Sequence, residues 1–308
     1  MWTEPPIIRD DQTGRERIDL RYRTVFLSDL HLGSSGCRAA ELSAFLKCVQ
    51  CDTLFLVGDV IDMWRLKSKW YWPGKHNRVI SRILKMARKG TRVIYVPGNH
   101  DEHARQYAGL SFGGVELMLD AEHTTTRGER LYITHGDQFD MVVKHARVLS
   151  ALGSWAYEIL LKVNRHYNRV RKLLGLNYWS LSQFLKLQVK SACTYISKFE
   201  DALVDEAKRK GFDGVVCGHI HKAEIRREDF NYYNCGDWVE SCTALVEDFD
   251  GSVKLLDGRR VIERLRESGQ LGGAARRRKR RVRAGHVADD AAITGGGPHQ
   301  PDHARSPA

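Results

Sequence analysis

Short apolar runs alternate with amphipathic segments along most of the chain. Eight of the apolar runs are predicted strands, at residues 24–27, 53–57, 91–96, 131–134, 214–217, 232–234, 244–246 and 253–256. Residues 39–49 and 79–88 instead repeat their apolar positions at helical spacing. Short, unalternating strands separated by helices predict an α/β fold with a buried sheet.

Three regions depart from this alternation. Residues 1–22 form a polar lead-in, so the domain is expected to span residues 23–268. Within it, residues 140–210 predict an inserted helical cap. Residues 269–308 include a run of arginines from Arg276 to Arg283 and cannot bury a core, which predicts a basic, disordered tail.

Five of the predicted strands end in Asp, Asn or His, mostly beside Gly. The endings are Asp29-Leu30-His31, Gly58-Asp59-Val60-Ile61-Asp62, Gly98-Asn99-His100-Asp101, His135-Gly136-Asp137 and Gly218-His219-Ile220-His221. Ligands of open α/β sheets bind at the carboxyl ends of the strands, and neighbouring strands lie about 5 Å apart. We therefore expect these side chains to converge on one site.

The side chains at the strand ends are typical of a metal centre. The candidate ligands are Asp29, His31, Asp59, Asn99, His135, His219 and His221. Hard oxygen and borderline nitrogen donors favour Mn²⁺, Fe²⁺, Zn²⁺ or Co²⁺ over Ca²⁺. Seven candidates exceed the needs of one tetrahedral ion and suit two divalent ions about 4 Å apart, with Asp59 as the expected bridge.

These motifs, in this order, resemble the calcineurin-like metallophosphoesterase superfamily. The resemblance implies a four-layer α/β/β/α sandwich around a dinuclear centre. It implies one ion held by Asp29, His31, Asp59 and His221, and a second held by Asp59, Asn99, His135 and His219. It also implies that His100 is catalytic, with Asp101 orienting it. Asp62 and Asp137 either support the ligands or have a structural role.

The inserted segment is basic, aromatic and rich in leucine, and Glu158 is the only acidic residue between Met141 and Phe199. Packing of two amphipathic helices accounts for most of the leucines. The near-absence of acids favours a cap that binds an anionic headgroup and apolar chains, or that docks on an anionic membrane. We predict substrate contacts from Arg165, Arg169, Trp179 and Lys186.

A basic cap between His135 and His219 resembles the UDP-2,3-diacylglucosamine diphosphatase family of lipid A synthesis, as does the segment at residues 233–241. The resemblance implies hydrolysis of the pyrophosphate to UMP and 2,3-diacylglucosamine 1-phosphate, with manganese as the metal. The best-studied branch of that family has Arg after the Asn, where this chain has His100. The chain therefore resembles a divergent branch, and its substrate is open.

Charge and cysteine content bear on partners and compartment. The net charge of +11 favours anionic partners. Seven cysteines without a regular framework, and an N-terminus without an apolar signal core, predict a cytoplasmic protein, with peripheral contact on the inner membrane as an option. The alternatives are a hydrolase of another phosphoester, a nuclease and a non-catalytic scaffold. The arginine run fits a membrane arm, a nucleic-acid arm or a solubilising tail, and no protein partner can be inferred.

Overall fold

The computed structural model describes residues 2–3, 7–9, 16–142 and 196–271. Its larger sheet has eight strands in the order β1-β15-β14-β4-β5-β6-β8-β7. Their bounds are β1 Trp2–Thr3, β4 Arg21–Leu27, β5 Gln50–Val57, β6 Arg92–Val96, β7 Ser111–Phe112, β8 Val115–Leu117, β14 Thr243–Glu247 and β15 Val253–Asp257. β4, β5, β6 and β8 are mutually parallel, which directs the carboxyl ends of these strands to one edge of the sheet.

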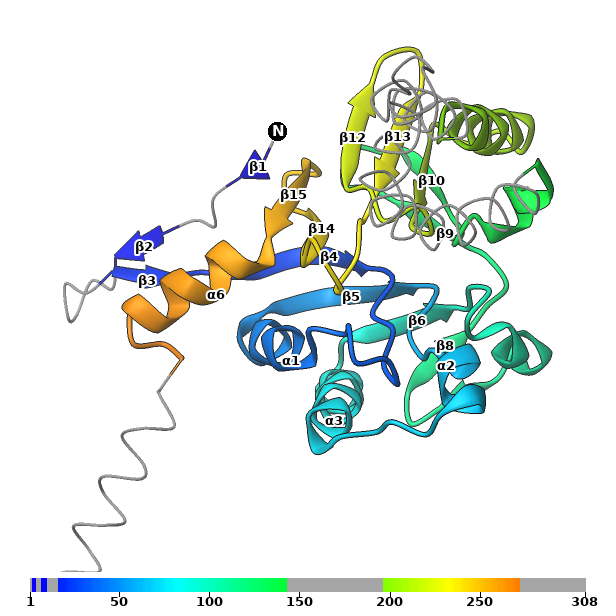
Figure 1. Cartoon of the computed structure of the whole chain (residues 1–308). Coiled ribbons are helices and arrows are strands. Elements are labelled where there is room, and N and C mark those ends of the chain that lie inside the picture. The colour runs from blue at the N-terminus through cyan, green and yellow to red at the C-terminus, as the bar shows by residue number, and fades with distance from the viewer. Residues whose placement is uncertain (1, 4–6, 10–15, 143–195, 272–308) are drawn as a thin grey trace, which may run out of the picture.

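A second sheet of five strands faces the first (Figure 1). Its order is β12-β13-β11-β10-β9, with β9 Ala121–Thr124, β10 Arg130–Ile133, β11 Gly214–Cys217, β12 Glu224–Arg227 and β13 Asn231–Asn234. β10, β11 and β13 are parallel. A separate two-stranded sheet pairs β2 (Ile7–Arg9) with β3 (Glu16–Ile18).

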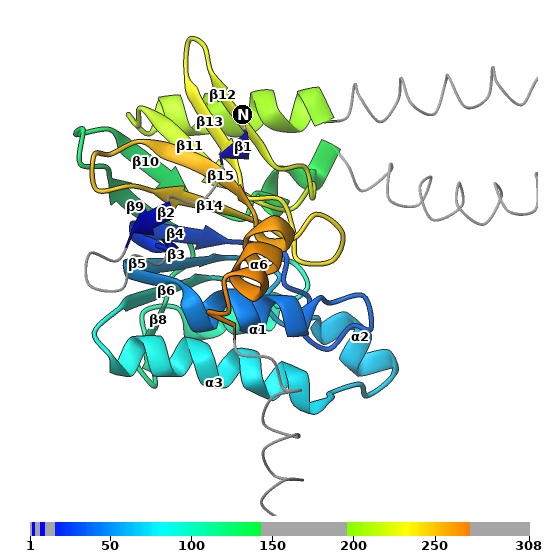
Figure 2. The same cartoon turned by 90° about the vertical axis from the view of Figure 1, so that its left-hand side faces the viewer.

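Helices cover the outer faces of the two sheets (Figure 2). The helical elements are α1 Ala39–Cys48, α2 Met63–Ser68, α3 Gly74–Arg88, α6 Gly258–Glu267, and the 3₁₀ turns η1 Glu102–Tyr107 and η2 Asp137–Val142. Residues 196–209 are also helical and pack Phe199, Leu203 and Ala207 against the smaller sheet. No helix in the described part of the chain has the length and apolar composition needed to cross a membrane.

The core between the sheets explains why the apolar runs do not alternate. Phe26 of β4 and Phe55 of β5 stack at 5.0 Å and pack toward Ile133 and Val216 of the second sheet. The other face of β4 and β5 packs on α1 and α3 through a separate cluster that includes Leu27. Strands buried on both faces have apolar residues at consecutive positions.

The mixed α/β class is confirmed. All eight predicted strands and both predicted helices are present; the strand ends are shifted by up to three residues, and α3 begins five residues before the predicted start at residue 79. The short strands β7, β8, β9 and β12, and helices α2 and α6, were not predicted. Strands β1 to β3 lie inside the predicted lead-in. Most of the predicted cap (residues 143–195) and of the predicted tail (residues 272–308) lie outside the described residues.

A charged network joins the two sheets at the edge away from the predicted metal ligands. The buried Glu247 carboxylate accepts hydrogen bonds from the Thr24 hydroxyl (2.8 Å), Arg23 Nη1 (2.7 Å) and the Thr126 N–H (2.9 Å), and its Oε2 lies 2.7 Å from His123 Nε2. Burial opposes ionisation, but the contacts from His123, Thr126 and Thr24 lower the pKa of Glu247 to about 2. The carboxylate therefore stabilises the fold in its charged form.

We expect Glu247→Gln to lower the free energy of unfolding by about 3 kcal/mol at pH 7, because it leaves buried donors without their anion. The folded pKa lies below that of an unfolded Glu, so the contribution is present at neutral pH and is lost as the pH falls from about 4 to 2. Urea unfolding at several pH values measures this. Glu116→Gln, which removes an exposed pair with Arg92, should cost less than about 1 kcal/mol. Equal losses for the two variants would contradict the interpretation.

Candidate metal centre

The strand ends converge as the sequence predicts. Three overlapping groups each bring ligand atoms within 4.8 Å of one another. They are Asp29–His31–His221, His31–Asp59–His100 and Asp29–Asp59–His135. Two of the three groups share Asp29, two share His31 and two share Asp59, so the groups form one continuous cluster. Its residues follow β4, β5, β6, β10 and β11 and thus come from both sheets.

The backbone at these positions is strained. Asp29, His31, Asp59, His219 and His221 have positive φ angles between 48° and 72°, and Cys242 is the only other described non-glycine residue that does. A left-handed conformation is costly for side chains with a Cβ atom and persists only where surrounding structure imposes it. Its concentration at predicted ligands indicates that the turns are shaped to aim these side chains inward.

Two glycines leave room for the cluster. A Cβ atom on Gly98 would lie 2.6 Å from His135 Nε2 and closer still to Asp59 Oδ1. A Cβ atom on Gly218 would lie 2.5 Å from Asp29 Oδ2. Glycine is thus required sterically at both positions, because the backbone of each loop passes against side chains of another loop.

Several buried ligand atoms of the cluster have no hydrogen-bond partner among the described residues. They are Asp29 Oδ1, His135 Nε2 and both amide atoms of Asn99; of these, Asp29 Oδ1 lies within ion-pair distance of His221 (3.0 Å) and His135 Nε2 within ion-pair distance of Asp59 (3.5 Å). Buried polar atoms are normally hydrogen-bonded, and unpaired ones call for an explanation. Oxygen and imidazole nitrogen atoms without hydrogen bonds in a buried cluster fit divalent cations, which would supply the missing interactions. The donor set is therefore compatible with the predicted dinuclear centre.

Asp29 is held by neighbours on three sides. The Ser28 hydroxyl and the His219 N–H (2.9 Å) contact Oδ2, and His221 Nε2 lies 3.0 Å from Oδ1. Burial opposes ionisation of Asp29, but contacts with His221 and His31 hold its pKa well below the usual range. The carboxylate is therefore charged and in place to bind a cation.

Asp59 lies between His31, His100 and His135. Its Oδ1 accepts a hydrogen bond from the His100 N–H (2.8 Å) and lies 3.5 Å from His135 Nε2. Its Oδ2 lies 3.8 Å from His31 Nε2 and 3.9 Å from His100 Nε2. Because His135 Nδ1 lies 3.0 Å from the carbonyl oxygen of Val57, its Nε2 is free to bind a metal.

The buried carboxylates also raise the pKa values of two imidazoles, those of His135 and His31. Burial opposes protonation of His135, but the charge of Asp59 raises its pKa to about 10; His31 is likewise raised to about 10 through Asp29 and Asp62. In the protein alone, protons on imidazoles compensate the buried negative charge. Divalent cations would replace these protons, because a metal-bound His must be neutral.

Asp62 contacts two imidazoles at once. Its Oδ2 lies 3.2 Å from His31 Nδ1, and its Oδ1 lies 2.9 Å from His100 Nδ1. Oδ1 also accepts the Arg65 N–H (2.9 Å) and so caps α2. Both Nε2 atoms are left facing the cluster, which is how a carboxylate orients histidine ligands. Trp64, not predicted as part of the site, packs its ring 4.3 Å from that of His100.

Asp101 and Asp137 contact groups other than the imidazole of His100. Asp101 accepts hydrogen bonds from the N–H groups of Gly98 (2.6 Å) and Val60 (2.7 Å), and from the Tyr95 hydroxyl, so it clamps two loops together. The imidazole of His100 contacts Asp62, so the expected orienting contact comes from Asp62 rather than from Asp101. The Asp137 carboxylate accepts two hydrogen bonds from Arg105 Nη2 (2.7 and 2.8 Å), a pair that no sequence motif signalled.

The remaining predicted residues fall into two sets. His219 lies beside the cluster, with its ring 5.1 Å from that of His135 and 5.7 Å from that of Phe199. The predicted substrate contacts Arg165, Arg169, Trp179 and Lys186 lie outside the described residues. The described residues thus contain the metal-binding end of the predicted site.

Comparison with known proteins agrees with this geometry. The family model for calcineurin-like phosphoesterase matches residues 22–223, well over half of the chain. The chain belongs to the calcineurin-like phosphoesterase family. It is accordingly a metal-dependent hydrolase.

Two relatives are both named UDP-2,3-diacylglucosamine hydrolase. The protein of Ralstonia nicotianae is 29% identical over 115 residues, which cover 36% of this chain and 42% of the relative. The protein of Aromatoleum aromaticum is 22% identical over 249 residues, which cover 70% of this chain and 86% of the relative. The chain thus spans less than half of the first relative and most of the second.

Solved structures match with low TM-scores. A predicted phosphoesterase of Streptococcus pneumoniae has a TM-score of 0.33 at 13% identity, covering 77% of this chain and 90% of that one. Vacuolar protein sorting 29 of Cryptosporidium parvum has a TM-score of 0.34 at 11% identity, covering 75% of this chain and 94% of that one.

We expect Gly98→Ala to lower metal occupancy and phosphoesterase activity about 10–100-fold, because the added methyl group displaces Asp59 and His135. Metal content after dialysis and hydrolysis of an aryl phosphodiester measure the effect. Gly74→Ala is the matched control, since nothing lies within 4 Å of its added Cβ atom. Full metal occupancy in Gly98→Ala would contradict the steric argument.

We expect Asp62→Asn to reduce activity about 10–100-fold while leaving the unfolding temperature nearly unchanged. An amide still caps α2, but it no longer offers two anionic oxygens to His31 and His100. Metal titration by calorimetry, together with kcat and KM, distinguishes a loss of metal affinity from a loss of turnover. Asp137→Asn should have a smaller effect, because its partner is Arg105. Activity within twofold of wild type for Asp62→Asn would refute the orienting role.

Proposed function

We propose that the chain cleaves the pyrophosphate of UDP-2,3-diacylglucosamine, releasing UMP and 2,3-diacylglucosamine 1-phosphate. The reaction class follows from the family, and the cluster of Asp29, Asp59 and their histidines is the observation that carries it. The substrate is supported by the name that both relatives bear, UDP-2,3-diacylglucosamine hydrolase, and by the basic, leucine-rich composition of residues 140–210.

We assign the seven predicted ligands to two divalent ions, with manganese as the proposed metal and Fe²⁺, Zn²⁺ and Co²⁺ as alternatives. Bound ions supply Lewis-acid charge that stabilises the transferring phosphoryl group. Asp59 suits the bridging role, because its two oxygens face different histidines: Oδ1 faces His135, and Oδ2 faces His31.

His100 is the proposed proton donor to the leaving oxygen. Its Nδ1 is held by Asp62, and Nε2 points toward the Asp59 carboxylate, where a phosphoryl group bound to the cluster would lie. The Trp64 ring packs on its imidazole and further restricts its rotation. An Asp–His pair of this kind keeps the second nitrogen aimed at the substrate.

The rest of the substrate is assigned to the inserted segment. We propose that Arg165, Arg169 and Lys186 bind the nucleotide and pyrophosphate charges and that Trp179 contacts an apolar portion. With a lipid-linked substrate, we propose a cytoplasmic location with contact at the inner face of the membrane. His100, where the best-studied branch has Arg, also favours a second possibility, hydrolysis of another phosphoester at the same centre.

Purified protein with Mn²⁺ is expected to release UMP from UDP-2,3-diacylglucosamine. Asp59→Asn should lower the rate at least about a thousandfold, because the proposed bridge loses its charge. UMP is quantified by chromatography, and an aryl phosphodiester is assayed in parallel. Hydrolysis of the aryl ester without UMP release would retain the reaction class and reject the substrate. If Asp59→Asn retained both activities, the proposed metal centre itself would be rejected.

A further inference from the structure

One surface segment beside the metal centre combines exposed aromatic and basic side chains. Residues 63–78 contain three Trp, one Tyr and five Lys or Arg, and no acidic residue. We define the aromatic–basic surface as Trp64, Arg65, Lys67, Lys69, Trp70, Tyr71 and Lys75. A solvated segment normally mixes both signs of charge and buries its tryptophans, so this composition calls for a ligand.

Trp70 projects from a fixed support. Its side chain is 75% exposed, yet its ring lies 6.5 Å from that of Trp72. Trp72 is held by a hydrogen bond from Nε1 to Asn77 Oδ1 (2.7 Å) and by an edge contact with the buried His76. The exposed indole is therefore presented by a rigid loop.

The basic side chains around Trp70 lack acidic partners. Arg65, Lys67 and Lys69 are exposed, and no described Asp or Glu forms an ion pair with them. Lys67 Nζ instead contacts His103 Nε2 (2.5 Å), a group that offers no negative charge. The surface consequently carries uncompensated positive charge next to apolar rings.

This segment is tied to the metal centre at both ends. Leu66 packs against Gly33, and the Gly33 N–H donates a hydrogen bond to His76 Nδ1 (3.1 Å). Gly33 follows the cluster residue His31 by two positions. At the start of the segment, Asp62 caps α2 and Trp64 packs on His100. The surface therefore adjoins the catalytic edge of the sheet.

We propose that the aromatic–basic surface docks the enzyme on an anionic lipid bilayer. Trp and Tyr are favoured at the interface between headgroups and acyl chains, and Lys or Arg beside them are attracted by anionic lipids. Docking there brings the metal centre to the interface in which a lipid-linked substrate resides. The inference rests on the proposed function, and it assigns docking to the loop after β5 rather than to the inserted segment.

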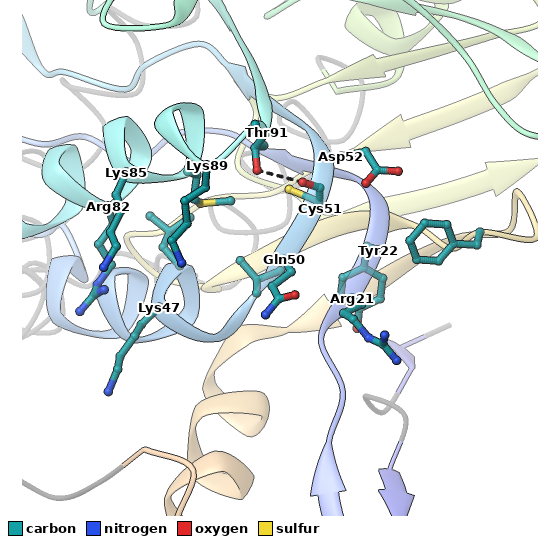
Figure 3. Close-up of a pocket in the computed structure, with 15 residues that line it drawn as sticks. Arg21, Tyr22, Lys47, Gln50, Cys51, Asp52, Arg82, Lys85, Lys89 and Thr91 are labelled. Atoms are coloured by element: carbon teal, nitrogen blue, oxygen red, sulfur yellow. Dashed lines mark hydrogen bonds between the residues drawn. The ribbon is translucent and has the colours of Figure 1, made fainter.

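A second basic region offers an internal comparison. A cavity of about 650 Å³ is lined by Arg21, Lys47, Arg82, Lys85 and Lys89 (Figure 3). It lies where β4 and β5 begin and α3 ends, at the edge of the sheet opposite the metal centre. A bilayer bound there would face away from the site. Substituting its cationic residues therefore tests whether positive charge alone suffices for binding to a bilayer.

The test is co-sedimentation of the full-length protein with vesicles of phosphatidylcholine containing one third phosphatidylglycerol. The triple variant Arg65→Glu, Lys67→Glu, Lys69→Glu should lower the partition coefficient at least about tenfold, and Trp70→Ala about fivefold. The triple variant Lys47→Glu, Lys85→Glu, Lys89→Glu should stay within about twofold of wild type, because its charges face away from the bilayer. All variants retain the arginine run, so the differences report the folded surface.

Three results would overturn the proposal. One is unchanged partition in both aromatic–basic variants, and another is an equal loss in the Lys47, Lys85, Lys89 variant. The third is weaker binding of duplex DNA with unchanged vesicle binding, which would reassign the surface to nucleic acid. The variants should also hydrolyse a soluble aryl phosphodiester at the wild-type rate. If wild type docks but releases no UMP, the proposed substrate fails while the docking surface stands.

Discussion

The central constraint on this molecule is the crowding of buried carboxylates and imidazoles at the carboxyl edge of the sheets. Asp29, Asp59 and His135 bring ligand atoms within 4.8 Å of one another, and Asp29 Oδ1 and His135 Nε2 have no hydrogen-bond partner among the described residues. Such a cluster is unstable unless positive charge enters it, as protons on the imidazoles or as metal ions. The loops adopt conformations that direct side chains into this cluster, since five of its predicted ligands have left-handed backbone conformations.

The packed core between the two sheets keeps these turns in their strained backbone conformations. Phe26 and Phe55, stacked between the sheets, fix β4 and β5 directly before the turns that carry Asp29 and Asp59. At the far edge Glu247 links the sheets through Thr24 and His123. Packing on both sides of the strands leaves the turns little freedom to relax, so the ligand geometry is set before any metal binds.

Reaction and substrate depend on different parts of the protein. The strand-end residues set the reaction class, because they form the cluster whatever the remainder of the substrate is. Substrate choice depends on what surrounds the cluster. Among the described residues, the loop that carries Trp64 and Trp70 forms part of these surroundings. The buried ligands and the exposed aromatic–basic surface together motivate the proposal of a lipid-linked phosphoester.

The sequence by itself determined the α/β class, the strand positions and the residues that gather at the centre. These features follow from local signals: apolar runs of strand length, and Gly, Asp, Asn and His directly after them. Only the tertiary structure decided that Asp62 holds His31 and His100, that Asp101 instead clamps two loops, and that Glu247 reaches His123. These contacts join residues that are distant in sequence, and their geometry depends on strand register and sheet packing. Neither can be read from a single chain's pattern, because many registers satisfy the same alternation of apolar and polar residues.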